Sequence, residues 1–463
     1  MEYINPLGEE KISKLLIKFS VPAIVGMMVN ALYNIVDRIF IGNSSDLGSY
    51  GLAGITICFP IMIILMAMGV LFGVGGATLF SLRLGEGKPQ EAENALGNAF
   101  VLLVIAGLSF MFLGQLFLKP ILLLFGANEI ILPYATEYMR VIFFGAVFQV
   151  VSMGMNNFIR ADGNPNIAML TMFLGAGVNI ILDPLLIFGF NMGMSGAALA
   201  TILAQAISTV WVVSYFIGKS SKHKLKREYT RLRLDFVTKI ATLGLPGFFM
   251  QLANSLLNMI LNKSLIIYGG NIAISGMGVI NSLLTIFLMP VIGIRQGSQP
   301  IISYNFGAEK YARVKHTVKL AIIASTIIAS VGYIIIRLFP EQIIFLFNKE
   351  PDLVEFTSYA LVRWLLLMPM VGFQIIASTF FQAIGKSKSA TFLTLTRQVI
   401  FLIPALIIFP KFWGLNGLIH AAPFADLSSV LVTGIWFYIN IKKLGKEATN
   451  PKPTICDIEV EHP

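Results

Sequence analysis

Two aspartates that interrupt long apolar stretches, Asp37 and Asp183, are the residues of this sequence best suited to chemistry. A carboxylate deep inside a membrane-length helix is costly to keep there, and such residues mark proton or ion pathways by default. Asn30, Tyr33, Asn34 and Asp37 follow the spacing i, i+3, i+4, i+7, which places them on one face of a helix. Lipid cannot satisfy such a face, so we expect it to point into protein or water.

Asp183 has a similar polar setting. Asn179 lies one helical turn before it, and Pro184 directly after it cannot donate a backbone hydrogen bond to the carbonyl of Ile180. Thr201, in the next apolar stretch, adds a hydroxyl group. Together these residues offer carboxylate, amide and hydroxyl oxygens, which are ligands for a proton or for a hard cation such as Na⁺. The alternative is that they only join helices, but an amide does so without the cost of ionisation.

The rest of the sequence predicts no enzymatic chemistry. Its two cysteines and four histidines are scattered, so they indicate neither a disulfide framework nor a metal cluster, and there is no Walker-type phosphate loop. We therefore expect no enzyme activity and no cofactor. Asp426 is the remaining acid deep in an apolar stretch. The bases at similar depth, Lys263, Arg295 and Arg363, could either pair with carbonyls or line a cavity.

Composition sets the environment of these groups. Of the 463 residues, 56% are hydrophobic and 13% are charged, whereas soluble domains carry about 25% charged residues. Lipid must therefore be the solvent, and the continuous apolar runs predict helices rather than a barrel. We expect an all-α integral membrane protein with about twelve spanning helices. They lie roughly at 14–40, 52–80, 94–117, 131–158, 166–188, 193–217, 237–268, 274–303, 316–338, 354–382, 389–410 and 415–440.

Basic residues predict the orientation of these helices. Lys and Arg crowd into alternate connections, above all into 219–236, whereas the opposite connections hold Lys119, Arg337, Lys349 and Lys411. By the positive-inside rule, both termini are cytoplasmic. This topology, rather than nucleic-acid binding, explains the net charge of +10. We expect a monomeric, multi-pass protein of the plasma (inner) membrane, with the lipid bilayer as its surroundings.

The basic segment also divides the sequence into two halves that resemble each other. SLRLGEGKPQEAENAL at 81–96 matches SYNFGAEKYARVKHTV at 303–318, and FIRADGNPN at 158–166 matches FFQAIGKSK at 380–388. An even number of spans per half gives a parallel repeat, with a central cavity that two rocking lobes expose to each side in turn. We expect a six-helix lobe at 1–218, a basic cytoplasmic linker at 219–236, a second six-helix lobe at 237–441 and a short cytoplasmic tail at 442–463.

Three stretches resemble a known family. VPAIVGMMVNALYNIVDRIFIG near the start, NNFIRADGNPNIAM between the fourth and fifth spans, and GVNIILDPLLIFG in the fifth span are similar to the multidrug and toxic-compound extrusion (MATE) transporters. The similarity is greatest to their bacterial DinF/MepA-like branch and extends over nearly the whole chain. It implies export of amphipathic, mostly cationic organic compounds by alternating access, in exchange for H⁺ or Na⁺.

The resemblance also implies roles for individual residues. It puts Asp37, Asn179, Asp183 and Thr201 in a cation-coupling site and Pro22 at a bend of the first helix. Cavity residues are Asn30, Tyr33, Asn156 and Met172, which match positions of the family's drug cavity, together with the polar Asn34, Gln251 and Asn254. Spans seven and ten carry no deep acid, unlike those of Na⁺-coupled relatives. We therefore expect H⁺ coupling, with Na⁺ at the same oxygens as the alternative.

Two other functions stay open at this point. A flippase for lipid-linked glycans or phospholipids has a related two-lobe fold, but its anionic cargo requires a basic cavity. Lys263, Arg295 and Arg363 favour that function, whereas Asp37 and Asp183 argue against it. A non-transporting receptor or scaffold would need a sizeable soluble domain, and the predicted tail is short and polar.

Overall fold

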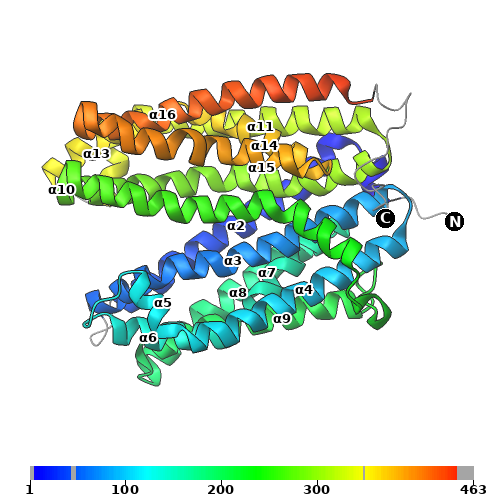
Figure 1. Cartoon of the computed structure of the whole chain (residues 1–463), viewed down its shortest axis with the longest axis horizontal. Helices are drawn as coiled ribbons and strands as arrows, with labels where there is room; N and C mark the ends of the chain where they lie inside the picture. The colour runs from blue at the N-terminus through cyan, green and yellow to red at the C-terminus, as the bar shows by residue number, and fades with distance from the viewer. Residues whose placement is uncertain (1–4, 43–47, 348–349, 446–463) are drawn as a thin grey trace, which may run out of the picture. The chain divides into compact units, whose positions relative to one another are not determined.

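The computed structural model describes residues 5–42, 48–347 and 350–445, and every regular element within these ranges is helical (Figure 1). This confirms the predicted all-α class. The elements are α1 (Pro6–Glu9), α2 (Ile12–Gly42), α3 (Gly48–Gly85), α4 (Pro89–Leu116), α5 (Leu118–Leu124), α6 (Leu132–Phe144), α7 (Ala146–Ala161), α8 (Pro165–Pro184), the π-helix η1 (Leu185–Gly189), α9 (Gly193–Ile217), the 3₁₀-helix η2 (Arg227–Thr230), α10 (Leu234–Gly307), α11 (Tyr311–Leu338), α12 (Pro340–Phe345), α13 (Pro351–Trp364), α14 (Met368–Ala383), α15 (Ser387–Leu395), the π-helix η3 (Thr396–Leu402) and α16 (Ile403–Lys443).

Within the described ranges, nine helical segments are long and apolar enough to cross a membrane, or eleven if each of two bent pairs is one span. The bent pairs are α6 with α7, at 56°, and α13 with α14, at 47°. Two long helices also contain breaks, α10 at Gly270 (φ 63°) and α16 at Gly414 (φ 55°). Glycine adopts this left-handed conformation readily because it has no Cβ. Both breaks fall between spans that the sequence predicts as separate.

The helices group into two compact units that do not follow chain order. The first unit comprises Lys18–Phe80 and Pro89–Leu256, and the second comprises Met1–Ile17, Ser81–Lys88 and Leu257–Pro463. The first part of α10 therefore belongs to the first unit, although the sequence places it at the start of the second lobe.

Glycines allow very close helix packing inside the first unit. A Cβ atom on Gly73 of α3 would lie 2.4 Å from the Cα atom of Gly154 on α7. On α10, a Cβ atom on Gly244 would lie 1.8 Å from the carbonyl oxygen of Leu71 on α3. No side chain fits in either place. Small residues of this kind let membrane helices approach closely, so the GVGG sequence at 73–76 serves helix packing.

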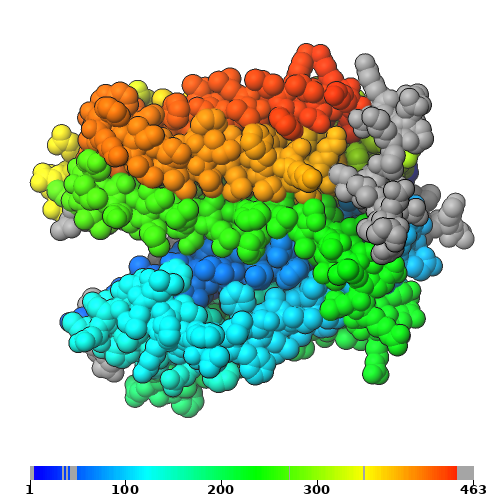
Figure 2. All heavy atoms as spheres, in the orientation of Figure 1, coloured from blue at the N-terminus to red at the C-terminus, as the bar shows by residue number. Residues whose placement is uncertain are grey.

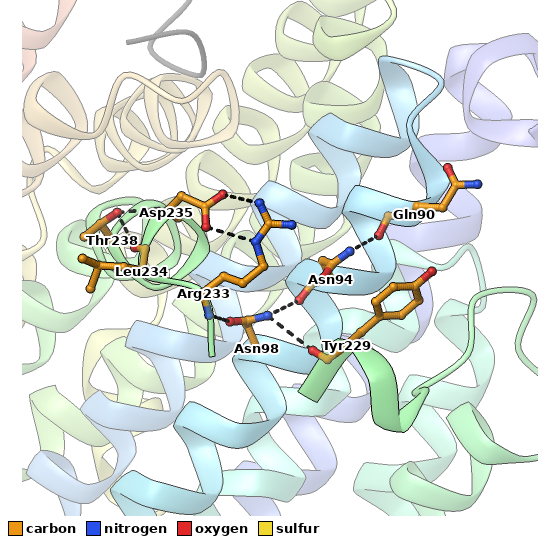
Figure 3. A network of polar contacts seen from close by, with 8 residues as sticks. All are labelled: Gln90, Asn94, Asn98, Tyr229, Arg233, Leu234, Asp235 and Thr238. Atoms are coloured by element: carbon orange, nitrogen blue, oxygen red, sulfur yellow. Dashed lines mark hydrogen bonds and ion pairs between the residues drawn. The ribbon is translucent and has the colours of Figure 1, made fainter. Parts of the chain in front are cut away.

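The basic linker is docked on the first unit through its backbone. Figure 3 shows Asn98 of α4 at the centre of this contact, where its amide donates to the carbonyl of Tyr229 (3.3 Å) and accepts from the backbone N–H of Arg233 (2.8 Å). Glu93, on the same helix, accepts from the backbone N–H of Lys224 (2.9 Å) and pairs with the ammonium of Lys226 (2.7 Å). This carboxylate raises the pKa of Lys226.

A buried carboxylate holds the start of the same linker. Asp162 follows α7, and its side chain is inaccessible to solvent. It accepts hydrogen bonds from the hydroxyls of Tyr215 (2.5 Å) and Ser221 (2.8 Å), and its Oδ1 lies 2.6 Å from Nδ1 of His223. Part of the linker is therefore an ordered element of the first unit rather than a loose connection.

Candidate cation-coupling site

The end of α8 is where the predicted polar residues begin to converge. Pro165 starts this helix at a position where a missing N–H costs nothing. Asp183 and Pro184 end it, and the chain continues as the π-helix η1, with the N–H of Phe190 donating to the carbonyl of Leu185 (2.9 Å). π-helical turns of this kind occur frequently at functional sites.

Asn179, Asp183 and Thr201 meet between α8 and α9. Asp183 is fully buried and Asn179 is 2% exposed. The amide of Asn179 donates to Oδ1 of Asp183 (3.3 Å) and reaches the hydroxyl of Thr201 at 3.5 Å. Thr201 in turn donates to the carbonyl of Ala197 (3.2 Å). The spacing predicts that Asn179 and Asp183 share one helix face, and the structure confirms that they interact.

Asp37 of α2 joins the same group. Its carboxyl lies in side-chain hydrogen-bonding range of Asp183, and the two acids interact electrostatically. Asp37 is half-buried. The Oδ2 atom of Asp183 is buried and accepts no hydrogen bond from another described group. The structure thus brings all four predicted coupling residues, from three different helices, into one cluster of the first unit.

Tyr138 of α6 also belongs to this environment, although the sequence did not suggest it. The side chain is 2% exposed, and its electrostatic neighbours include Asp37, Asp183 and Tyr33. The only signal in the sequence is a phenol within an apolar stretch. Tyrosine is common at such positions, so the residue could not be singled out before the place of α6 relative to α2 and α8 was known.

The predicted cavity residues are spread along several helices. Asn30 and Tyr33 of α2 are half-buried. Gln251 and Asn254 are also half-buried and lie on the part of α10 that belongs to the first unit. The side chain of Asn34 lies outside the described residues.

Two further cavity residues and the predicted bend have informative surroundings. Asn156 of α7 is 8% exposed, and its Oδ1 has no hydrogen-bond partner among the described groups. Met172 of α8 packs against α2, because a Cβ atom on Gly26 would lie 2.6 Å from its sulfur. Pro22 is buried inside α2, one turn before Gly26.

The second unit pairs its deep acid with a base. Asp426 of α16 is buried and forms an ion pair with Arg397 of η3, with 2.5 Å between Oδ1 and Nε. This contact joins two elements of one unit and involves none of the predicted coupling residues.

The three deep bases of the second unit have different surroundings. The guanidinium of Arg363 lies 3.5 Å from the ring centre of Tyr359 and donates to its carbonyl (3.2 Å), as one of the two predicted alternatives states. Lys263 is exposed. The Nε atom of Arg295 is buried and has no hydrogen-bond partner in the described ranges.

Comparison with known proteins decides the family. The MatE family profile matches residues 22–185 and 246–407, one match in each half of the repeat. The chain belongs to the MatE family. It is therefore a membrane transporter and not an enzyme, and the resemblance seen in the sequence is confirmed.

Individual relatives agree with this assignment. The chain is 28% identical to the multidrug export protein MepA of Staphylococcus haemolyticus over 97% of this chain and 98% of that protein. It is also 28% identical to MepA of Staphylococcus aureus (strain MSSA476), over 95% and 96%. Among solved structures, a ligand complex of the MATE multidrug transporter DinF-BH is 37% identical, with a TM-score of 0.89 over 96% of this chain and 98% of that one.

Proposed function

We propose that this MATE transporter is a proton-coupled multidrug efflux antiporter that exports amphipathic, mostly cationic organic compounds by alternating access. The contact between Asp37 and Asp183 is the observation that carries the coupling mechanism. The names of the MepA relatives and of the multidrug transporter DinF-BH support drugs as substrates. We place the protein as a monomer in the cell membrane, with both termini in the cytoplasm.

The acid cluster binds the coupling ion in this proposal. Two carboxyl groups in contact resist joint ionisation, because their negative charges repel each other. A proton held by one carboxyl group lets it donate a hydrogen bond to the other, which two ionised carboxylates cannot do. Asn179 and Thr201 orient Asp183 through its Oδ1 side. Na⁺ could use the same oxygens, but then both acids would be ionised together, and a metal would have to take the place of the shared proton.

The drug and the proton compete for the negative charge of the acid cluster. A cationic compound near the cluster favours ionised carboxylates and thereby expels the proton. Pro22 is the proposed point at which α2 bends. The proposed drug-binding residues are Asn30, Tyr33, Asn34, Asn156, Met172, Gln251 and Asn254. The coupling ion can drive the switch between the inward-open and outward-open states only if it binds these two states with different affinity.

Reconstitution into liposomes tests the proposal. A pH gradient and a Na⁺ gradient are imposed separately, and the movement of ethidium is followed by fluorescence. We expect transport to follow the pH gradient and drug binding to release protons. Transport that ignores the pH gradient but follows the Na⁺ gradient would refute proton coupling, and movement of labelled phospholipid instead of ethidium would favour a flippase.

A further inference from the structure

A pocket lies in the first unit away from the acid cluster, where α4, α5 and α6 meet. In Figure 1, α5 and α6 (cyan) lie at the left end of that unit, and α4 runs along the unit; cyan atoms form the surface of that end in Figure 2. The pocket is open to the surface, with a volume of about 570 Å³. It is lined by Gln115, Leu116, Leu118, Lys119, Pro120, Arg140 and Phe144.

No described residue forms an ion pair with the two basic side chains of this pocket. Lys119 and Arg140 are both exposed. Glu137, one turn before Arg140, forms no ion pair with it; its Oε1 instead accepts from the backbone N–H (3.0 Å) and the hydroxyl (2.8 Å) of Ser195. The lining, as far as the described residues form it, contains no acid, so the pocket presents two positive charges to whatever enters it.

Two apolar residues of the lining are exposed as well, whereas Leu118 is buried. Leu116 is 72% exposed and Phe144 is 60% exposed. The amide of Gln115 donates to the carbonyl of Arg140 (2.6 Å), which places Arg140 level with the end of α4. Because α4 is a membrane span, its end lies near the boundary between hydrocarbon and headgroups, where long basic side chains reach toward polar groups.

We propose that this pocket binds the phosphate of an anionic phospholipid, with Lys119 and Arg140 on the phosphate and Leu116 and Phe144 against the acyl chains. A phosphate diester satisfies both cations, and the chains cover apolar surface that water would otherwise meet. A zwitterionic lipid fits less well, because its ammonium group finds no acid among the described lining residues. This inference does not depend on the direction or the coupling of transport.

Native mass spectrometry of the purified full-length chain tests the proposal. Phosphatidylglycerol and phosphatidylcholine with identical acyl chains are added at equal concentration, and bound lipid is counted. We expect phosphatidylglycerol to bind more strongly, and Lys119→Gln/Arg140→Gln to weaken it by about fivefold per cation removed. The matched control, Arg337→Gln/Lys411→Gln, removes two exposed cations elsewhere and should change little.

Further measurements keep the test decisive. Arg140→Lys keeps the charge and should retain most of the preference, while the Gln115 bond, which uses the backbone of Arg140, survives in every variant. Equal binding of the two lipids, or a preference that survives in the double variant, would overturn the proposal. Displacement of phosphatidylglycerol by millimolar inorganic phosphate would also overturn it, since the site would then hold a small anion rather than a lipid.

Discussion

The carboxyl groups of Asp37 and Asp183 lie within hydrogen-bonding range of each other in the first unit, although they come from α2 and α8. Asp183 is also oriented by Asn179, which touches Thr201 of α9. In the proposed mechanism these two acids share one proton, so they act as one unit rather than as two separate groups. Changes at either acid should therefore have closely related consequences for transport.

Neutralising either acid should abolish proton coupling. We expect Asp37→Asn and Asp183→Asn each to reduce ethidium transport driven by a pH gradient by about tenfold or more, and the double variant to add little, because residues of one network are not additive. Proteoliposome fluorescence measures this. Asp235→Asn is the control, since that acid is exposed and pairs with exposed Arg233. Normal transport by Asp183→Asn would reduce that residue to a structural role.

The hydroxyl of Thr201 should orient the side-chain amide of Asn179 rather than contribute much to folding. Thr201→Val keeps the shape but removes the acceptor that Asn179 reaches at 3.5 Å, whereas Thr201→Ser keeps it. We expect Thr201→Val to lower coupled transport several-fold and Thr201→Ser to retain most of it, with about 1 kcal/mol or less of stability lost by either. Equal transport by the two variants, measured in the same liposomes, would exclude this role.

The ion pair between Asp426 and Arg397 should be structural. The Asp426 side chain is 4% exposed and that of Arg397 is 21% exposed. Removing one partner leaves a buried charge, so we expect Asp426→Ala to cost about 3 kcal/mol and to lower the thermal unfolding midpoint in detergent. Asp426→Ala/Arg397→Ala should be less destabilised than the single variant. A single variant with an unchanged midpoint but impaired transport would instead assign Asp426 to the mechanism.

The docked linker should be released by a change at Asn98. This side chain is fully buried and hydrogen-bonds to the backbone of Tyr229 and Arg233. Asn98→Ala therefore leaves two backbone groups without a partner, and each costs about 1–3 kcal/mol of stability. We expect trypsin to cleave the linker about tenfold faster in this variant, since local opening governs cleavage. Asn94→Ala is the control, because its side chain bonds within α4, to Gln90. Equal cleavage of both variants would argue against tight docking.

The sequence by itself determined the helical membrane class, most span positions and the identity of the deep acids. The reason is that lipid forces each span to be a continuous apolar helix and makes every intramembrane acid expensive. Asp37, Asp183 and Asp426 were therefore conspicuous without any structure. The spacing of Asn179 and Asp183 was also sufficient to place them together, because that relationship is local to one helix.

Only the tertiary structure decided which helix faces meet. Helical spacing shows which side of its own helix a residue occupies, but not what packs against that side. The contact between Asp37 and Asp183, the approach of Tyr138, the Arg397–Asp426 pair and the docking of the linker on Asn98 all join segments far apart in the chain. The same holds for the pocket of Lys119 and Arg140, which exists because the end of α4 packs beside α6.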